Sequence, residues 1–252
     1  MIRVQSLMKS FHDPKRGTVM AVDGISFEAR AGEIFGLLGS NGAGKTTTMR
    51  MLATILKPTG GSAEVAGYDI VKSAPDVRRS IGFLSGDMGY YHRLSPREVL
   101  NIFGQLNGLS GSALRDRVEL LITEFEMTAY ADARADTFST GMRQRANVAR
   151  VLVHDPPVLI LDEPTSGLDV PTAQIIEQFI VRAKTQGKCV VLSTHIMEEA
   201  EYLCDRIAVV HGGKLQALGT MDELRLQTGK QRLREVFLAL IHSSSDTAKV
   251  VA

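Results

Sequence analysis

The stretch that decides the fold reads Glu33-Ile34-Phe35-Gly36-Leu37-Leu38-Gly39-Ser40-Asn41-Gly42-Ala43-Gly44-Lys45-Thr46-Thr47. Residues 33–38 form a short apolar run typical of a strand, and residues 46–52 have the pattern of a helix. The glycines between them let the backbone turn tightly and bring its N–H groups close to an anion. The new helix directs its free N–H groups and positive dipole end to the same point. The G-x-x-x-x-G-K-[ST] pattern therefore predicts a phosphate-binding loop.

Two side chains of this loop have predicted roles of their own. Lys45 supplies a positive charge for the β- and γ-phosphates of a nucleoside triphosphate, and Thr46 supplies a hydroxyl for Mg²⁺, an ion that takes few protein ligands. A glycine-rich turn that binds nothing is the alternative, and the Lys-Thr pair directly after the last glycine argues against it. The predicted nucleotide contacts are Gly39, Ser40, Asn41, Gly42, Ala43, Gly44, Lys45, Thr46 and Thr47.

Composition is that of an ordinary globular chain. The 252 residues are 44% hydrophobic and 23% charged, and the formal net charge is +1. We find no basic tract with interleaved aromatic residues, so we expect no nucleic-acid partner. No run of about 18 apolar residues predicts a membrane span, and Met1–Leu7 lacks the apolar core of a signal peptide, so we expect a cytosolic location. Cys189 and Cys204 are expected to be buried, unbridged thiols.

The order of predicted elements indicates an α/β fold with a mixed sheet. Strand patterns at residues 2–11, 20–22 and 25–29 favour an antiparallel N-terminal sheet. Continuous apolar runs at 157–161 and 189–193 are typical of parallel strands that are covered on both faces. Helical spacing dominates at 96–106, where Ser95 is the predicted cap, and at 114–125 and 143–154; further helices are predicted at 74–79, 172–185, 197–203 and 233–241. We divide the chain into a core (1–85 and 155–225), an inserted helical subdomain (86–154), and a C-terminal amphipathic helix with a loose tail (226–252).

A second group of polar residues follows the predicted parallel strands. Asp162 and Glu163 end one buried strand, and His195 ends the next. Ligands of open parallel sheets bind beyond these strand ends. We assign Asp162 to Mg²⁺, Glu163 to the base that orients the attacking water, and His195 to the γ-phosphate or that water. The alternatives are a solvated turn for the carboxylates and a structural role for the histidine.

Two further features depend on weaker patterns. Ser139 and Gly141 precede the strong helix predicted at residues 143–154. The start of this helix is a second place where an anion could bind. One triphosphate needs one phosphate-binding loop, so this second start suggests a site shared between two chains. Phe11 has a π-face that could stack on an adenine ring, and a core position is the equally favoured alternative.

Taken together, the motifs resemble the ATP-binding subunit of an ABC transporter. They are, in order, Gly39–Thr47, Phe138–Gln144, Leu159–Pro164, Ser166-Gly167-Leu168-Asp169 and Thr194-His195. The resemblance implies a P-loop NTPase (RecA-like) core and a head-to-tail dimer that closes on ATP and opens after hydrolysis. ATP would lie between the phosphate-binding loop of one chain and Ser139 with Gly141 of the other. Asp169 matches the loop that communicates across the dimer, and Phe11 matches the aromatic residue that stacks on adenine.

Finer features resemble one branch, the ABC-2-type exporters and particularly bacterial sodium-export ATPases of the NatA type. Phe138-Ser139-Thr140-Gly141-Met142 replaces the commoner Leu-Ser-Gly-Gly-Gln. This resemblance implies a separate ABC-2-type membrane permease, a second ATP-binding subunit (a second copy of this chain), and a place on the cytoplasmic face of the membrane. Sodium ions or drugs are the implied cargo. An ABC ATPase of ribosome function, repair or assembly is the alternative.

One residue departs from the family pattern. The family usually has Gln after the strand that is predicted here at Ile81–Leu84, and this chain has Gly86. Gly86 has no amide to contact Mg²⁺ or water, so we expect Asp87 or an additional water to replace it. The resemblance also places the permease-docking surface near Asp87–Leu94, although the apolar and aromatic residues Met88, Tyr90 and Tyr91 could equally belong to the core.

Overall fold

A computed structural model describes residues 1–15, 17–86 and 89–249, with side chains as far as residue 242. A six-stranded sheet forms its centre, in the order β10-β9-β3-β8-β7-β6. Neighbouring strands are parallel except at the β9–β10 edge, so the predicted mixed α/β core is confirmed. The strands are β3 (Ile34–Leu38), β6 (Ile81–Leu84), β7 (Val158–Asp162), β8 (Cys189–Thr194), β9 (Arg206–His211) and β10 (Lys214–Gly219).

The N-terminal residues form the predicted antiparallel sheet, with the order β2-β1-β4-β5. One prediction for it was wrong, because residues 20–22 and 25–29 belong to a single long strand. Gly24, at a φ of 71°, and register shifts in β1 absorb the irregular spacing without a turn. The strands are β1 (Ile2–Asp13), β2 (Gly17–Ala29), β4 (Gly60–Val65) and β5 (Tyr68–Asp69).

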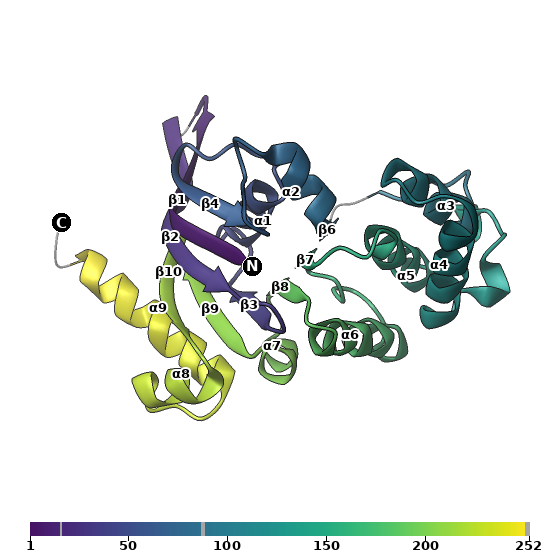
Figure 1. The fold of residues 1–252 in the computed structure, drawn as a ribbon. Helices are drawn as coiled ribbons and strands as arrows, with labels where there is room; N and C mark the ends of the chain where they lie inside the picture. Colours follow the sequence, from purple (N-terminus) through teal and green to yellow (C-terminus); the bar gives the residue numbers. More distant parts are fainter. Residues whose placement is uncertain (16, 87–88, 250–252) are drawn as a thin grey trace.

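Four helices pack beside the sheets, as Figure 1 shows. They are α1 (Lys45–Leu52), α2 (Ala74–Ser80), α6 (Val170–Thr185) and α7 (Met197–Leu203). Helix α6 begins two residues before the predicted start at Thr172, because the Asp169 carboxylate accepts a hydrogen bond from the Thr172 N–H at 2.9 Å. Asp169 is therefore the N-cap of this helix.

The inserted helical subdomain lies at one end of the molecule (Figure 1). Ser95 and Glu98 form a capping box at the start of its first helix, which has the predicted bounds. The third helix begins at Thr140 and not at Arg143, since Ser139 caps it. Buried residues of the insert, among them Phe125 and Val148, share one hydrophobic cluster with Leu159 and Leu192 of the sheet, so the insert is packed onto the core. Its helices are α3 (Pro96–Leu106), α4 (Gly111–Glu124), η1 (Thr128–Tyr130), η2 (Ala135–Thr137) and α5 (Thr140–Leu152).

The C-terminal part differs from the prediction in two ways. A helix that was not predicted, α8 (Met221–Thr228), spans position 225, so the expected division at 225/226 falls inside it. Helix α9 (Leu233–Lys249) continues beyond the predicted end at Ile241, through residues expected to be loose. Leu233 and Val236 are fully buried in a cluster that includes residues of β9, which attaches both helices to the sheet.

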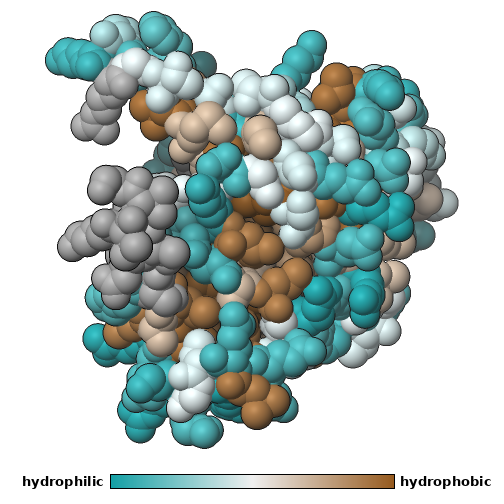
Figure 2. Space-filling view, turned by 90° about the vertical axis from the view of Figure 1, so that its left-hand side faces the viewer, coloured by the Kyte–Doolittle hydropathy of each residue, from teal (hydrophilic) through white to brown (hydrophobic). Residues whose placement is uncertain are grey.

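Within the described ranges, no helix combines the length and apolar character that a membrane crossing requires. Figure 2 shows apolar surface surrounded by polar residues on the face that carries β2 and α9. Exposed apolar residues of these two elements include Met20 and Leu238, each 42% exposed.

Candidate active site

The phosphate-binding loop (Gly39–Thr47) connects β3 to α1 and is packed tightly on two sides. A Cβ on Gly39 would lie 2.4 Å from the Val210 carbonyl oxygen, and a Cβ on Gly44 would lie 2.5 Å from the Ala21 carbonyl oxygen. Gly44 also has a φ of 106°, which a side chain would strain. These two glycines are therefore required by the close approach of β9 and β2, in addition to any requirement of phosphate binding.

A distant hairpin also supports the loop. The Gly213 N–H donates to the Ala43 carbonyl at 3.0 Å, and the Asp23 N–H donates to the Gly213 carbonyl at 2.8 Å. The turn between β9 and β10 thus connects the loop to β2. Gly212-Gly213 is recognisable in the sequence as a hairpin turn, but nothing in its pattern indicates contact with residue 43.

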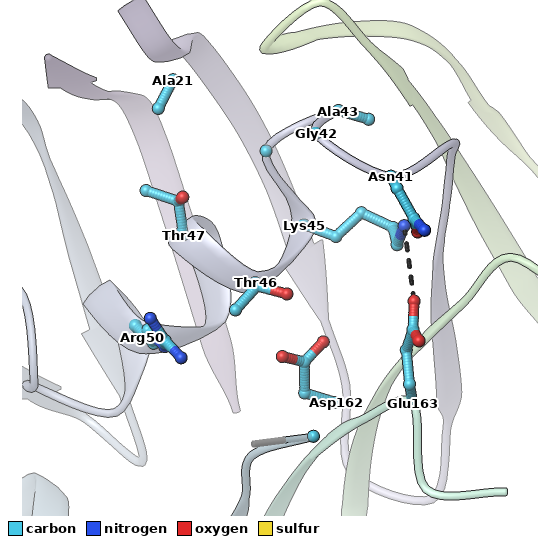
Figure 3. Close-up of a pocket in the computed structure, with 12 residues that line it drawn as sticks. Ala21, Asn41, Gly42, Ala43, Lys45, Thr46, Thr47, Arg50, Asp162 and Glu163 are labelled. Atoms are coloured by element: carbon cyan, nitrogen blue, oxygen red, sulfur yellow. Dashed lines mark ion pairs between the residues drawn. The ribbon is translucent and has the colours of Figure 1, made fainter. Parts of the chain in front are cut away.

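A cavity of about 520 Å³ opens at the start of α1. Lys45, Thr46, Asp162 and Glu163 come together in it from two segments distant in the sequence (Figure 3). Three residues that line it are absent from the predicted contacts to nucleotide or metal: Ala21, Arg50 and Gly86. Of these, only Gly86 was expected near the site, because it follows the strand at Ile81–Leu84. The remaining lining residues are Asn41, Gly42, Ala43, Gly44 and Thr47.

Lys45 is the buried cation of this cavity, at 5% exposed. Its ammonium donates to the carbonyls of Gly39 at 2.7 Å and Ser40 at 3.2 Å, and lies 3.9 Å from Oε1 of Glu163. Burial lowers the pKa of Lys45, and the carboxylates of Glu163 and Asp162 partly oppose this effect. A cation held in this way is suited to binding phosphate oxygens.

The strand-end residues lie together as predicted. Strands β7 and β8 are parallel neighbours, with Asp162 opposite Ser193. His195 follows β8, and its Nδ1 lies 3.0 Å from Oε1 of Glu163. Glu163 has a φ of 50°, an unusual value for a residue with a side chain, and such backbone costs about 1 kcal/mol or more. The strain is located at the residue to which we assign the base.

Ser193 contacts both carboxyl residues, and the sequence pattern did not single it out. Its hydroxyl donates to Oδ1 of Asp162, and its oxygen accepts from the Glu163 N–H at 3.1 Å. Its carbonyl accepts from the same N–H, also at 3.1 Å. A serine is an ordinary residue in a strand of this kind, so only the pairing of β7 with β8 reveals its position.

The cavity contains the oxygen ligands that Mg²⁺ prefers. Thr46 contributes a hydroxyl and Asp162 a carboxylate that is 3% exposed, and both line the cavity. Among the residues that the structure describes, no group of three or more His, Cys, Asp or Glu side chains is placed to hold a metal. A site with two oxygen donors fits an ion that keeps most of its waters and binds phosphates.

Ser139, Gly141 and Asp169, hereafter the second set, lie outside the lining of this cavity. They are neighbours of one another, because a Cβ on Gly141 would lie 2.9 Å from Oγ1 of Thr172, the residue whose N–H Asp169 caps. Gln144 Nε2 donates to the Pro164 carbonyl at 2.7 Å, which connects α5 to the loop before Asp169. Ser139 and Asp169 are exposed, so the second set faces outward.

The remaining predicted residues have mixed outcomes. Phe11 is 42% exposed with the Lys9 ammonium 5.2 Å from its ring centre, so the core alternative was wrong.

Gly86 lines the cavity, as its position after β6 led us to expect, whereas Asp87 and Met88 lie outside the described residues. Tyr90 is buried against Phe138, and Tyr91 is 48% exposed. Both cysteines are free.

The fold and this site define an ATPase of the P-loop class with an inserted helical subdomain. The family model described as ABC transporter matches residues 22–166, and the chain belongs to that family. It is 39% identical to the ABC transporter ATP-binding protein NatA of Bacillus subtilis, covering 95% of this chain and 97% of that one. It is 42% identical to the doxorubicin resistance ATP-binding protein DrrA of Mycobacterium tuberculosis, covering 85% and 65%. A solved ATP-binding subunit of an ABC transporter superposes with a TM-score of 0.87 at 28% identity, covering 96% and 99%.

Proposed function

We propose that two copies of this chain associate head to tail and bind two ATP molecules between them. The observation that carries this proposal is the separation of the cavity from the second set, which faces outward on the same chain. A head-to-tail arrangement brings the second set of one copy to the phosphate-binding loop of the other. Ser139 and Gly141 would then meet the phosphates through the start of α5, and Phe11 would stack on the adenine.

The residues of the cavity have distinct proposed roles in hydrolysis. The loop N–H groups and the Lys45 ammonium bind the phosphates. Thr46 and Asp162 would hold Mg²⁺, which neutralises charge on the phosphates when bound. Glu163 accepts a proton from the attacking water, and His195, in contact with Glu163, orients the carboxylate and reaches the γ-phosphate. Asp169, a member of the second set, communicates between the copies.

Size measurements with two variants test this proposal. Glu163→Gln removes the base but keeps the shape of the side chain, so it should bind ATP, dimerise and hydrolyse it at least about 100-fold more slowly. Lys45→Ala removes the phosphate-binding cation, so it should lose ATP binding and remain monomeric. Size-exclusion chromatography with light scattering, with and without ATP, separates these outcomes. A Glu163→Gln protein that stays monomeric on ATP, or that hydrolyses it rapidly, contradicts the proposal.

We further propose that dimer closure powers export through a separate ABC-2-type membrane permease, with the ATPase bound at the cytoplasmic face of the membrane. The names of the relatives support this, since NatA is named as an ABC transporter ATP-binding protein and DrrA as a doxorubicin resistance ATP-binding protein. A groove of about 490 Å³ between β6, α3 and α5 is suited to a docking helix. Buried Arg150 lies in it, 5.0 Å from the Phe103 ring centre and 5.7 Å from that of Tyr91.

A pull-down distinguishes export from the alternative, a non-transport ABC ATPase. The tagged chain should recover a polytopic membrane protein from detergent-solubilised cells, and Phe103→Glu, in the groove, should reduce that recovery. Recovery of ribosomes or of assembly factors in place of a membrane protein would refute the exporter proposal and leave the ATPase intact. The cargo, sodium ions or a drug, requires transport measurements on the complex with its permease.

A further inference from the structure

We infer that Ser193 is a positioning residue that fixes the orientation of Asp162 and Glu163 for hydrolysis. The inference rests on the roles proposed above for these two carboxylates. Ser193 does not line the cavity and is 0% exposed, so it has no route to nucleotide or water. Any effect that it has on the chemistry must therefore pass through its neighbours.

The Ser193 hydroxyl makes a hydrogen bond to each carboxyl residue, as the donor in one and the acceptor in the other. A serine hydroxyl carries one proton and two lone pairs. In Ser193 the proton is donated to Oδ1 of Asp162, and a lone pair accepts the Glu163 N–H at 3.1 Å. This donated proton orients the Asp162 carboxylate, whose other oxygen would then be available to hold Mg²⁺. A side chain without a hydroxyl can make neither of these two contacts, whereas threonine can make both.

The second contact falls on the strained part of the site. Glu163 holds a φ of 50°, and residues in such conformations persist only when their surroundings determine them. The Ser193 hydroxyl and carbonyl both accept the Glu163 N–H, which fixes the peptide that precedes the strained residue. The direction of the Glu163 side chain depends on this backbone, and its Oε1 reaches His195 Nδ1 at 3.0 Å. Ser193 thus positions the base through the main chain.

These contacts predict which measurements change when the hydroxyl is removed. In Ser193→Ala the carbonyl still accepts the Glu163 N–H, so the fold is retained. The Asp162 carboxylate loses its orienting donor, and loss of such a partner reduces metal affinity or activity by about 10-fold to 100-fold. Binding of nucleotide without Mg²⁺ involves the loop and Lys45, which Ser193 does not contact, so it should not change.

The experiment compares Ser193→Ala with Ser193→Thr and with a matched control, Ser95→Ala. Ser95 is also a buried serine (4% exposed), but its hydroxyl caps α3 in the helical subdomain. We would measure kcat against Mg²⁺ concentration, Mg²⁺ binding to the ADP complex by calorimetry, and ADP binding in EDTA. Ser193→Ala should weaken Mg²⁺ binding and lower kcat, each by about 10-fold, with ADP binding unchanged. Ser193→Thr should restore both to within about threefold.

Two results would overturn the inference. One is a Ser193→Ala protein whose Mg²⁺ affinity and kcat match those of Ser95→Ala, and the other is a Ser193→Thr protein as impaired as Ser193→Ala while equally well folded. Failure here is distinct from failure of the proposed function. Glu163→Gln, measured in parallel, tests the base itself, so a stalled Glu163→Gln with a normal Ser193→Ala would refute only the inference about Ser193.

Discussion

Gly44 and Gly42 offer a matched pair of substitutions within one loop. Both have left-handed backbone, with φ of 106° and 81°, so alanine strains the main chain at either position. Their surroundings differ. A Cβ at Gly44 would lie 2.5 Å from the Ala21 carbonyl oxygen in β2, whereas a Cβ at Gly42 meets nothing within 4 Å. We predict that Gly44→Ala destabilises the protein much more than Gly42→Ala does.

The expected difference in the free energy of unfolding follows from two costs, that of left-handed backbone and that of steric overlap. Left-handed backbone costs a residue with a side chain about 1–2 kcal/mol. Overlap with a backbone atom that cannot rotate away adds about 1–3 kcal/mol. Alanine also restricts the unfolded chain, but this effect is shared by both variants and cancels in the comparison. The free energy of unfolding should therefore fall by about 1 kcal/mol in Gly42→Ala and about 3 kcal/mol in Gly44→Ala.

Urea denaturation followed by circular dichroism, in nucleotide-free buffer, measures this difference. Without nucleotide, the contacts of the loop with phosphate do not contribute. At this chain length the difference of about 2 kcal/mol corresponds to a fall in Tm of about 4–8 °C. Equal stability of the two variants, with unchanged m-values, would refute the claim that contact with β2 requires the second glycine.

Three further outcomes are expected. Burial raises the pKa of the Glu199 carboxyl, so the folded state favours its protonated form, and stability is lost as the pH rises through that pKa. Glu199→Gln should therefore be more stable than the wild type at pH 8, with the difference disappearing near pH 4 in urea titrations. Phe237→Ala should lower the free energy of unfolding by about 3–5 kcal/mol in the same assay, because Phe237 is 7% exposed in the cluster under α9. Gly86→Gln should change it by less than about 0.5 kcal/mol, since a Cβ there meets only the Asp162 carbonyl at 3.5 Å, and an unchanged ATPase rate would mean that the missing amide is compensated.

Local sequence signals were sufficient to predict a helix start when all the residues that determine it lie within one helical turn. Ser95 and Pro96 predicted the start of α3 correctly, because a cap and its partner Glu98 lie within four residues. The same kind of signal was present for α8, where Thr220 and Glu223 form a capping box and Gly229 ends the helix. It was missed because the apolar pattern behind it is short.

Contacts between distant segments could not be predicted in the same way. Glu163 and His195 were placed together only by assuming that β7 and β8 are neighbours, an assumption that the sheet order confirms. The support of the loop by Gly213 and the bridge made by Ser193 depend on which side chains and carbonyls face each other across strands. Periodicity gives the face of a residue but not the identity of its neighbour on the next strand.

The order of the sheet also has a consequence for how the chain is made. Strand β3 lies between β8 and β9, and Ile34 pairs with Val190. All five residues of β3 are buried. During synthesis on the ribosome, however, β3 is made long before its partner strands β8 and β9, so it is unpaired at first. Such long-range pairing slows folding, and an unpaired apolar strand is prone to aggregate in the interval. Nascent chains that stop before residue 189 lack both β8 and β9, so they should neither bind ATP nor protect β3 from a chaperone or a protease.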